Sequence, residues 1–321
     1  MIDYRWKHTL CMQYLRIILG TRGSELARAQ ARLVEKAIQT MRTEAKIETK
    51  IIATKGDKAR VLDLRAGRKG LFTAEIERAL VAGDIDVAVH SAKDLPSETS
   101  PDAEIAAVLP RAAVDDILVS KHPGGLASLP HGATVATGSV RRKHQLLWRR
   151  ADLHIVSLRG NVPTRLRKLA ENEWDAIVLA RAGLERLGLS PSPRQISFEC
   201  SRFFLEILPR EIFLPAGGQG IIALQVRADD QGTKSVLDLI KDRETLLCLH
   251  AERQFLRALH ADCNCPVSVF ANIENGTMKM RAQVFAIELA APRQAEVEGA
   301  LQGWEMLPAG LLRKIEARVG A

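Results

Sequence analysis

The sequence predicts an α/β fold in which two similar α/β lobes flank a cleft and a smaller α+β domain follows them. Three observations lead to this prediction. Strand-like and helix-like segments alternate through the first 110 residues, the same alternation begins again after Pro110, and the C-terminal third changes to alternating strand patterns that end in a helix. Strands that alternate with helices are typical of mainly parallel sheets covered by helices.

The composition is that of a globular protein with an excess of basic residues. The chain has 321 residues, 46% of them hydrophobic, and a formal net charge of +8. No apolar run approaches the roughly 20 residues that a membrane helix needs. Five cysteines, an odd number, and a start without an apolar signal core lead us to expect a cytoplasmic protein with reduced thiols. An anionic ligand fits the positive charge, but nucleic acid and a membrane surface fit it equally well.

The first lobe is expected to begin with a strand over residues 15–19, because residues 1–14 show no periodic pattern and are assigned to an N-terminal extension. A helix is expected over 25–41, with Ser24 as its N-cap. Its apolar face is expected from the spacing of Leu26, Ala29, Leu33, Ala37 and Ile38. The further predicted segments of this lobe are a strand over 46–53, a loop rich in Gly and Arg over 54–69, a helix over 73–82 and a strand over 85–90.

The second lobe repeats this order, and the C-terminal region follows it. Its predicted strands and helices alternate over 134–137, 140–148, 154–158, 159–170 and 176–180. Residues 190–210 are rich in Pro and Ser at first and predict a surface loop with a short element. The remaining segments are a strand over 221–226, a helix over 241–259, strands from 267 and a helix near 311–317. The expected domains are residues 15–110 with 211–228, residues 111–210, and residues 229–321.

Two groups of polar residues carry candidate chemistry in the lobes. Residues 90–96, His-Ser-Ala-Lys-Asp-Leu-Pro, directly follow a predicted buried strand. Such loops often bind ligands, although a surface turn closed by Pro96 explains the segment equally well. Arg and Lys residues also gather where strands lead into helices, and helix N-termini with guanidinium groups suit carboxylates. For any single Arg, a solvated helix face is the alternative.

A third group lies in the C-terminal region, where Cys263 and Cys265 are close in sequence to His250 and His260. The spacing fits no common zinc pattern, which argues against a metal site. Two buried apolar thiols, or a point of covalent attachment, explain the same residues.

Seven segments that extend from about residue 15 onward form a pattern together. They are TRGS at 21–24, KGLF at 69–72, AVHSAKDLP at 88–96, GSVRR at 138–142, SLRGNVPTR at 157–165, AGLERLG at 182–188 and LPAGGQG at 214–220. No single segment is specific, but their joint occurrence is. In kind and in order they resemble the porphobilinogen deaminase family.

The resemblance implies a transferase, hydroxymethylbilane synthase, that deaminates four porphobilinogen molecules and joins them head to tail. It also implies a dipyrromethane cofactor, made by the enzyme itself and held by a thioether to a cysteine that Cys263 matches. Asp94 matches the catalytic aspartate, whose carboxylate accepts pyrrole N–H bonds and offsets developing positive charge. The family usually has two glycines before the cofactor cysteine, where this chain has Ala261 and Asp262.

The other matched residues are expected to hold the acetate and propionate groups of the pyrroles, because cationic and hydroxyl side chains bind and position carboxylates. Those expected at the cofactor, besides Asp94 and Cys263, are Ser91, Lys93, Thr137, Ser139, Arg141 and Arg142. Those expected at the substrate are Arg22, Ser24, Lys69, Arg159, Arg165 and Arg186.

The resemblance further implies lobes similar to periplasmic binding proteins and a monomer without metal, membrane or nucleic-acid partners. Two rival functions fit the same pattern. An anion-binding protein would have the same lobes, but the expected lack of a signal peptide and the cysteine-bearing third domain argue against it. An RNA-binding protein would explain the basic residues in 141–150, but an aromatic content of 4% leaves few platforms for base stacking.

Overall fold

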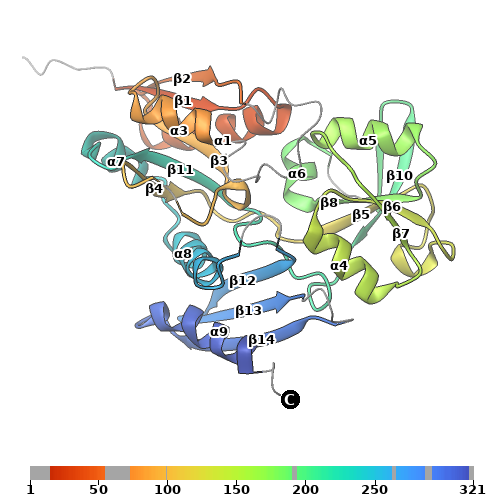
Figure 1. The fold of residues 1–321 in the computed structure, drawn as a ribbon. Helices are drawn as coiled ribbons and strands as arrows, with labels where there is room; N and C mark the ends of the chain where they lie inside the picture. Colours follow the sequence, from red (N-terminus) through yellow and green to blue (C-terminus); the bar gives the residue numbers. More distant parts are fainter. Residues whose placement is uncertain are drawn as a thin grey trace, which may run out of the picture.

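The residues that the computed structural model describes form three separate sheets (Figure 1). Two α/β lobes, red to orange and green in the figure, lie side by side, and a smaller blue domain adjoins both. This architecture confirms the predicted fold class. Residues 1–14, the expected extension, lie outside the described part, which consists of residues 15–54, 73–98, 100–189, 194–261, 265–285 and 291–317.

The first lobe has a five-stranded sheet in the order β2-β1-β3-β11-β4. β1 is parallel to β2 and β3, whereas β11 lies antiparallel between β3 and β4. Val236 and Leu237 of α7 pack into the core of this lobe. The strands are β1 (Arg16–Thr21), β2 (Lys46–Ile51), β3 (Val87–Ser91), β4 (Ala103–Val108) and β11 (Ile222–Arg227), and the helices are α1 (Glu25–Met41), α3 (Ala74–Val81) and α7 (Gln231–Leu237).

Helix α1 has the predicted bounds and the predicted cap, since Ser24 Oγ accepts a hydrogen bond from Ala27 N at 3.3 Å. The predicted apolar face is wrong at Leu33, which is 43% exposed, whereas Val34 and Ile38 are fully buried. The buried stripe also includes Gln30, which is 3% exposed. The helix is therefore turned so that one polar residue faces the sheet.

The second lobe has a six-stranded sheet in the order β7-β6-β8-β5-β10-β9. β6 is parallel to β7 and β8, and β5 is antiparallel to β8 and β10. The strands are β5 (Asp116–Ser120), β6 (Thr134–Ala136), β7 (His154–Val156), β8 (Ala176–Ala180), β9 (Gln195–Phe198) and β10 (Ser201–Ile207). The helices are α4 (Val140–Arg149), α5 (Val162–Glu171) and α6 (Arg181–Arg186), with a short 3-10 turn at Leu126–Ser128.

Where a surface loop with one short element was expected over 190–210, the structure has two strands, β9 and β10; residues 190–193 lie outside the described part. The two strands form an antiparallel hairpin, and β10 extends the sheet next to β5. Phe203 and Leu205 of β10 are buried, while Arg202 before them is exposed and Phe204 between them is half-buried. This alternation is a strand signal, but the preceding prolines suggested a loop.

The C-terminal domain is an antiparallel meander of three strands, with two helices that pack on it and on each other. Phe255 of α8, Met278 and Met280 of β13 and Leu311 of α9 are fully buried in its core. Its elements are α8 (Arg243–Ala258), β12 (Val267–Glu274), β13 (Thr277–Val284), β14 (Arg293–Ala300), a 3-10 turn at Trp304–Met306 and α9 (Leu307–Glu316).

Two segments connect the lobes, residues 109–115 from β4 to β5 and residues 208–221 from β10 to β11. Two glycines let the second connection lie close to its neighbours. Gly220 has φ +86°, and a Cβ there would lie 2.5 Å from Ala112 O in the first connection. Gly218 has φ +73°, and a Cβ there would lie 2.9 Å from Lys93 N. Only glycine combines this conformation with this approach.

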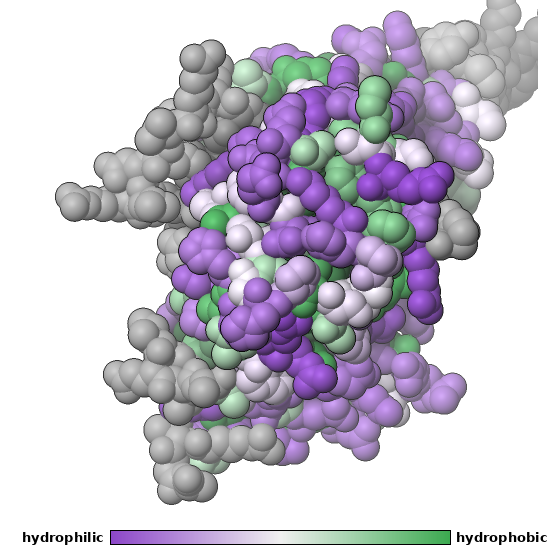
Figure 2. Space-filling view, turned by 90° about the vertical axis from the view of Figure 1, so that its right-hand side faces the viewer, coloured by the Kyte–Doolittle hydropathy of each residue, from purple (hydrophilic) through white to green (hydrophobic). Residues whose placement is uncertain are grey.

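The surface is largely polar on the face shown in Figure 2, where hydrophilic side chains are spread widely and hydrophobic ones lie between them. Within the described ranges, every helix is too short or too polar to cross a bilayer.

Candidate active site

Strand β3 carries Ser91, Lys93 and Asp94 to the edge of the first lobe. The strand ends at Ser91, and the chain turns into a 3-10 helix over Ala92–Asp94. Ala92 and Leu95 are buried in an apolar cluster, whereas Asp94 is exposed and Lys93 is half-buried. The apolar residues thus anchor the turn, and the charged side chains between them remain available to a ligand.

A hollow of about 60 Å³ lies beside Asp94. Residues at the start of α1 and the end of β3 line it, including Arg22, Ser24, Gln30 and Ser91. Gln30 Nε2 donates a hydrogen bond to Ser91 Oγ at 2.7 Å. The structure therefore brings together Arg22, Ser24, Ser91 and Asp94, which the sequence predicted for substrate, cofactor or catalysis. Sequence reasoning missed Gln30, although a polar residue inside an apolar helix face is a detectable signal.

Two further polar residues line the hollow, and each has one buried side-chain atom without a hydrogen-bond partner in the described structure. The atoms are Thr73 Oγ1 and His90 Nε2. Burial lowers the pKa of His90 to about 4, against the effect of hydrogen bonding with Gln225, and the charge of Arg22 lowers it further. The imidazole is consequently neutral near pH 7, so the hollow offers neutral polar groups beside the cation.

Cations from both lobes interact with Asp94. Burial and the charge of Arg142 lower the pKa of Arg165 in α5 to about 10, while the carboxylate of Asp94 opposes this shift. Burial and Arg142 likewise lower the pKa of Lys93 to about 8, again opposed by Asp94. Arg159 also acts on Arg165. The carboxylate of the first lobe therefore lies within electrostatic range of a cation from the second.

Arg186 of α6 lies toward the connection between the lobes. Its Nη2 donates a hydrogen bond to Gly220 O at 2.6 Å, and burial lowers its pKa to about 10. Arg165 is similarly held, since its Nε donates to Gly160 O at 2.7 Å. Both guanidinium groups have further N–H groups with which to bind an anion.

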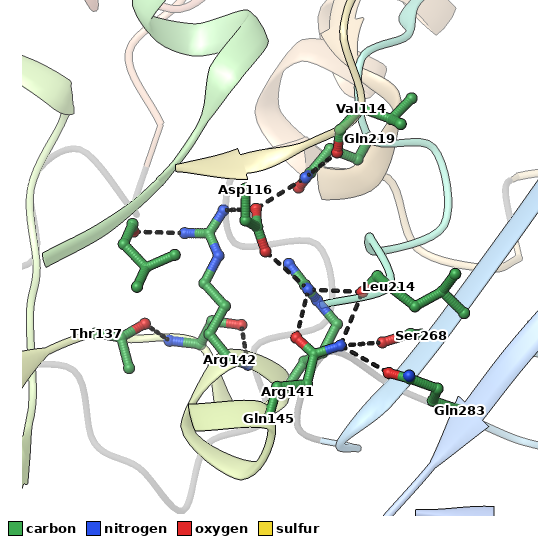
Figure 3. A network of polar contacts seen from close by, with 12 residues as sticks. Val114, Asp116, Thr137, Arg141, Arg142, Gln145, Leu214, Gln219, Ser268 and Gln283 are labelled. Atoms are coloured by element: carbon green, nitrogen blue, oxygen red, sulfur yellow. Dashed lines mark hydrogen bonds and ion pairs between the residues drawn. The ribbon is translucent and has the colours of Figure 1, made fainter. Parts of the chain in front are cut away.

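Arg141 and Arg142 are buried, each 5% exposed, and share the carboxylate of Asp116 (Figure 3). Arg141 Nη1 lies 2.9 Å from Asp116 Oδ2, and Arg142 Nη2 lies 2.7 Å from Asp116 Oδ1. Burial alone would raise the pKa of Asp116, but the two guanidinium groups hold it well below its usual range. Sequence reasoning missed Asp116, because an aspartate that opens an apolar strand gives no sign of its partners.

Thr137 and Ser139 shape the start of α4. Ser139 Oγ accepts a hydrogen bond from Arg142 N at 3.4 Å, and Thr137 Oγ1 accepts one from Ser139 N at 3.2 Å. Gly138 between them is required, since a Cβ there would lie 2.4 Å from Leu158 O. The two hydroxyl groups thus position the first turn of α4, and their protons remain available to a ligand.

A second buried ion pair joins the connection to the C-terminal domain. Arg111 Nη1 lies 2.7 Å from Glu252 Oε1 of α8. Glu252 also accepts hydrogen bonds from Gly218 N at 2.6 Å and from Ala271 N at 2.8 Å. Sequence reasoning missed this pair, because the two residues are 141 positions apart.

Lys69 and Cys263 lie outside the described residues, so the predicted roles of these two side chains stay predictions. The described donor set nevertheless fits a ligand with several carboxylates. Arg142 Nε is buried and has no hydrogen-bond partner there, and it acts electrostatically on Lys93 and Arg165. A ligand carboxylate would satisfy this donor. In the described part of the chain no cluster of His, Cys, Asp or Glu is suited to a metal ion.

Comparison with solved structures finds the methionine-binding protein MetQ. It is 15% identical with a TM-score of 0.43 and covers 72% of this chain and 92% of its own. This likeness is too weak to say anything of function.

Comparison with known sequences is far more specific. The family model for the porphobilinogen deaminase dipyrromethane cofactor-binding domain matches residues 17–235, and the model for its C-terminal domain matches residues 246–317. Porphobilinogen deaminase from Syntrophomonas wolfei is 43% identical over 273 residues, 84% of this chain and 85% of the relative. That from Syntrophotalea carbinolica is 40% identical over 311 residues, 93% and 95% of the two chains. The chain belongs to the porphobilinogen deaminase family.

Proposed function

We propose that this protein is a hydroxymethylbilane synthase, a transferase that deaminates porphobilinogen, joins four units head to tail and releases the linear product by hydrolysis. Family membership over most of the chain supports this activity. The structural observation that carries it is the exposed carboxylate of Asp94, which lines one hollow with Arg22 and whose charge also acts on Lys93 and on Arg165 of the opposite lobe. This combination of one anion and several cations suits a pyrrole with two carboxylates, because the anion can accept the pyrrole N–H and the cations can bind the carboxylates.

Asp94 is proposed as the catalytic residue. Positive charge develops on the pyrrole ring when the aminomethyl nitrogen of porphobilinogen leaves as ammonia. A carboxylate fixed at the end of a buried strand can accept the pyrrole N–H and stabilise that charge. Asp94 is well placed for this role because Ala92 and Leu95 anchor its turn while its own side chain is exposed.

The cations and hydroxyl groups are proposed to bind and orient the pyrrole carboxylates. Dipyrromethane, when bound, supplies the free pyrrole α-carbon to which the first unit is joined. We propose that Cys263 holds the dipyrromethane covalently. The acetate and propionate groups of this cofactor are proposed to contact Ser91, Lys93, Asp94, Thr137, Ser139, Arg141 and Arg142. The substrate is proposed to contact Arg22, Ser24, Lys69, Arg159, Arg165 and Arg186. A carboxylate bound by several fixed donors leaves its ring little freedom, which favours reaction.

Intact mass tests this proposal directly. The purified protein is expected to exceed its sequence mass by one dipyrromethane unit and to give the colour of a pyrrole with a free α-position with Ehrlich's aldehyde reagent. Cys263→Ser is expected to abolish both signals, while the control Cys265→Ser keeps them. If only Cys265→Ser lost the added mass, the assignment of Cys263 as the attachment thiol would be wrong. If the unaltered protein carried no added mass, the proposed function would be refuted.

We also propose that the protein acts as a cytoplasmic monomer with domains at 15–110 with 211–228, 111–210 and 229–321, except that α7 in the last range packs on the first lobe. Sedimentation of the holoenzyme would measure its mass and so test the proposed monomer. RNA is a poor alternative ligand, since Arg141 and Arg142 are buried rather than presented on a basic surface.

A further inference from the structure

We propose that Asp116 is a positioning residue that holds Arg141 and Arg142 ready for a ligand carboxylate, and that Gln219 extends this hold to Lys93 in the first lobe. The inference rests on the proposed function, because the ligand is taken to be a pyrrole carboxylate. It goes beyond that function in assigning a role to two residues that need not touch the ligand.

The carboxylate of Asp116 is buried between two guanidinium groups and one amide. Asp116 is the first residue of β5 and is fully buried. Besides the two arginines, its Oδ1 accepts a hydrogen bond from Gln219 Nε2 at 2.9 Å (Figure 3). One buried negative charge is thus surrounded by two guanidinium groups, which leaves the cluster with an excess positive charge.

The hydrogen bonds of Arg142 indicate where that excess charge is directed. Its Nη2 is bonded to Asp116, and its Nη1 donates to Val178 O at 2.8 Å. Its Nε is buried and without a partner in the described structure. A buried donor without an acceptor is unfavourable, so a ligand carboxylate that accepts this bond is favoured. Asp116 determines the orientation of the Arg142 guanidinium group, because it holds Nη2 and leaves Nε for a ligand.

Gln219 transmits the arrangement to the other lobe. It is 1% exposed, and its Nε2 also donates to Val114 O at 2.7 Å. Its Oε1 accepts a hydrogen bond from Lys93 Nζ at 3.4 Å. Lys93 therefore has a neutral partner that is itself fixed by Asp116. Without this carboxylate, three neighbouring cations would repel one another before any ligand is bound, and preorganisation would be lost.

The adjacent residue supplies a matched control. Asp115 is also buried and pairs with two arginines, with Arg210 Nε at 2.6 Å and Arg181 Nη1 at 3.6 Å. Neither of these arginines belongs to the proposed binding set. Asp115→Asn therefore removes the same charge from the adjacent position without releasing Arg141 or Arg142.

The test compares Asp116→Asn with Asp115→Asn. Each variant is prepared as apoprotein, checked for folding by circular dichroism and mixed with porphobilinogen, and the gain of dipyrromethane is followed by intact mass. Asp116→Asn is expected to load about tenfold more slowly than wild type, since misplaced binding groups lower rates by at least this much. Loaded Asp116→Asn is expected to show a KM for porphobilinogen raised about tenfold with a smaller change in kcat. Asp115→Asn should load at the wild-type rate.

Two outcomes would overturn the inference. Folded Asp116→Asn that loads at the wild-type rate with an unchanged KM would show that Asp116 only stabilises the fold. If Asp116→Asn does not fold, Gln219→Met takes its place, since it keeps the volume but removes the bonds to Asp116 and Lys93. Loading of Gln219→Met at the wild-type rate would then refute the proposal. Wild-type protein that gains no pyrrole mass would refute the proposed function itself, which is a separate result.

Discussion

At the scale of single residues, the site combines one exposed carboxylate with cations whose environments differ. Asp94 is exposed, Lys93 is half-buried, and Arg141 and Arg142 are buried around Asp116. Burial weakens protonation of Lys93, so its charge is lost at a lower pH than that of an exposed lysine. The buried arginines remain charged and are held by bonds to the protein. A substitution of exposed Asp94 can therefore change the reaction without disturbing the buried cluster around Asp116.

Asp94→Asn is expected to lower kcat by about a hundredfold or more, because it removes the charge that stabilises the transition state. Stability should change by less than about 0.5 kcal/mol, since the side chain is exposed. Steady-state kinetics and thermal unfolding measure the two effects. Asp84→Asn, an exposed aspartate of the same lobe, is the control and should retain activity. Full activity of Asp94→Asn would contradict the proposed mechanism.

At the scale of elements, strand ends and helix starts place the functional groups. β3 ends at Ser91, α1 is capped by Ser24, and α4 is capped by Ser139, so each cap lies beside a proposed binding residue. The sequence predicted the cap of α1 at Ser24 and the start of α4 at residue 140, because such signals are local. The apolar pattern of α1 failed at Leu33, which is exposed, since the face that a helix buries depends on what packs against it.

The connection with Gly218 and Gly220 gives a prediction at this scale. Gly220→Ala is expected to lower the free energy of unfolding by about 2–4 kcal/mol, through the unfavourable φ and the contact with Ala112 O. Gly132→Ala is the matched control: Gly132 has φ +74° but no atom within 4 Å of a Cβ, so about 1 kcal/mol of backbone strain is expected. Denaturant unfolding of both variants measures the difference, and equal losses would rule out a role for the close contact.

At the scale of the whole molecule, buried hydrogen bonds and ion pairs join the two lobes and the C-terminal domain. Arg111 and Glu252 link the lobe connection to α8, and Gln145 Nε2 of α4 donates to Ser268 Oγ and Gln283 Oε1 of the C-terminal domain. Gln219 links the two lobes. A buried hydrogen bond or ion pair that is broken leaves polar groups without water to replace the partner. These contacts therefore favour one placement of the two lobes and the C-terminal domain relative to one another.

Glu252→Gln is expected to destabilise the protein by about 3–5 kcal/mol, because it leaves the charge of Arg111 buried without its partner. The double variant with Arg111→Met should recover part of this loss, and thermal or denaturant unfolding would measure the coupling. Glu48→Gln removes an exposed ion pair with Arg16 and should have a much smaller effect. A Glu252→Gln variant as stable as Glu48→Gln would show that the buried pair contributes little.

The sequence by itself determined the alternating strands and helices around β1 to β3 and β6 to β8, the two-lobe class, the family and the segment that carries Asp94. These features are local, since hydrophobic period, caps and contiguous motifs are written in neighbouring residues. The sequence did not show β4, β5, α7 or the hairpin of β9 and β10. Only the tertiary structure decided that Asp116 partners Arg141 and Arg142, that Gln219 reaches Lys93, and that β10 extends the second sheet beside β5. Those contacts join residues far apart in the chain, and their energies depend on burial and distance, which no local pattern contains.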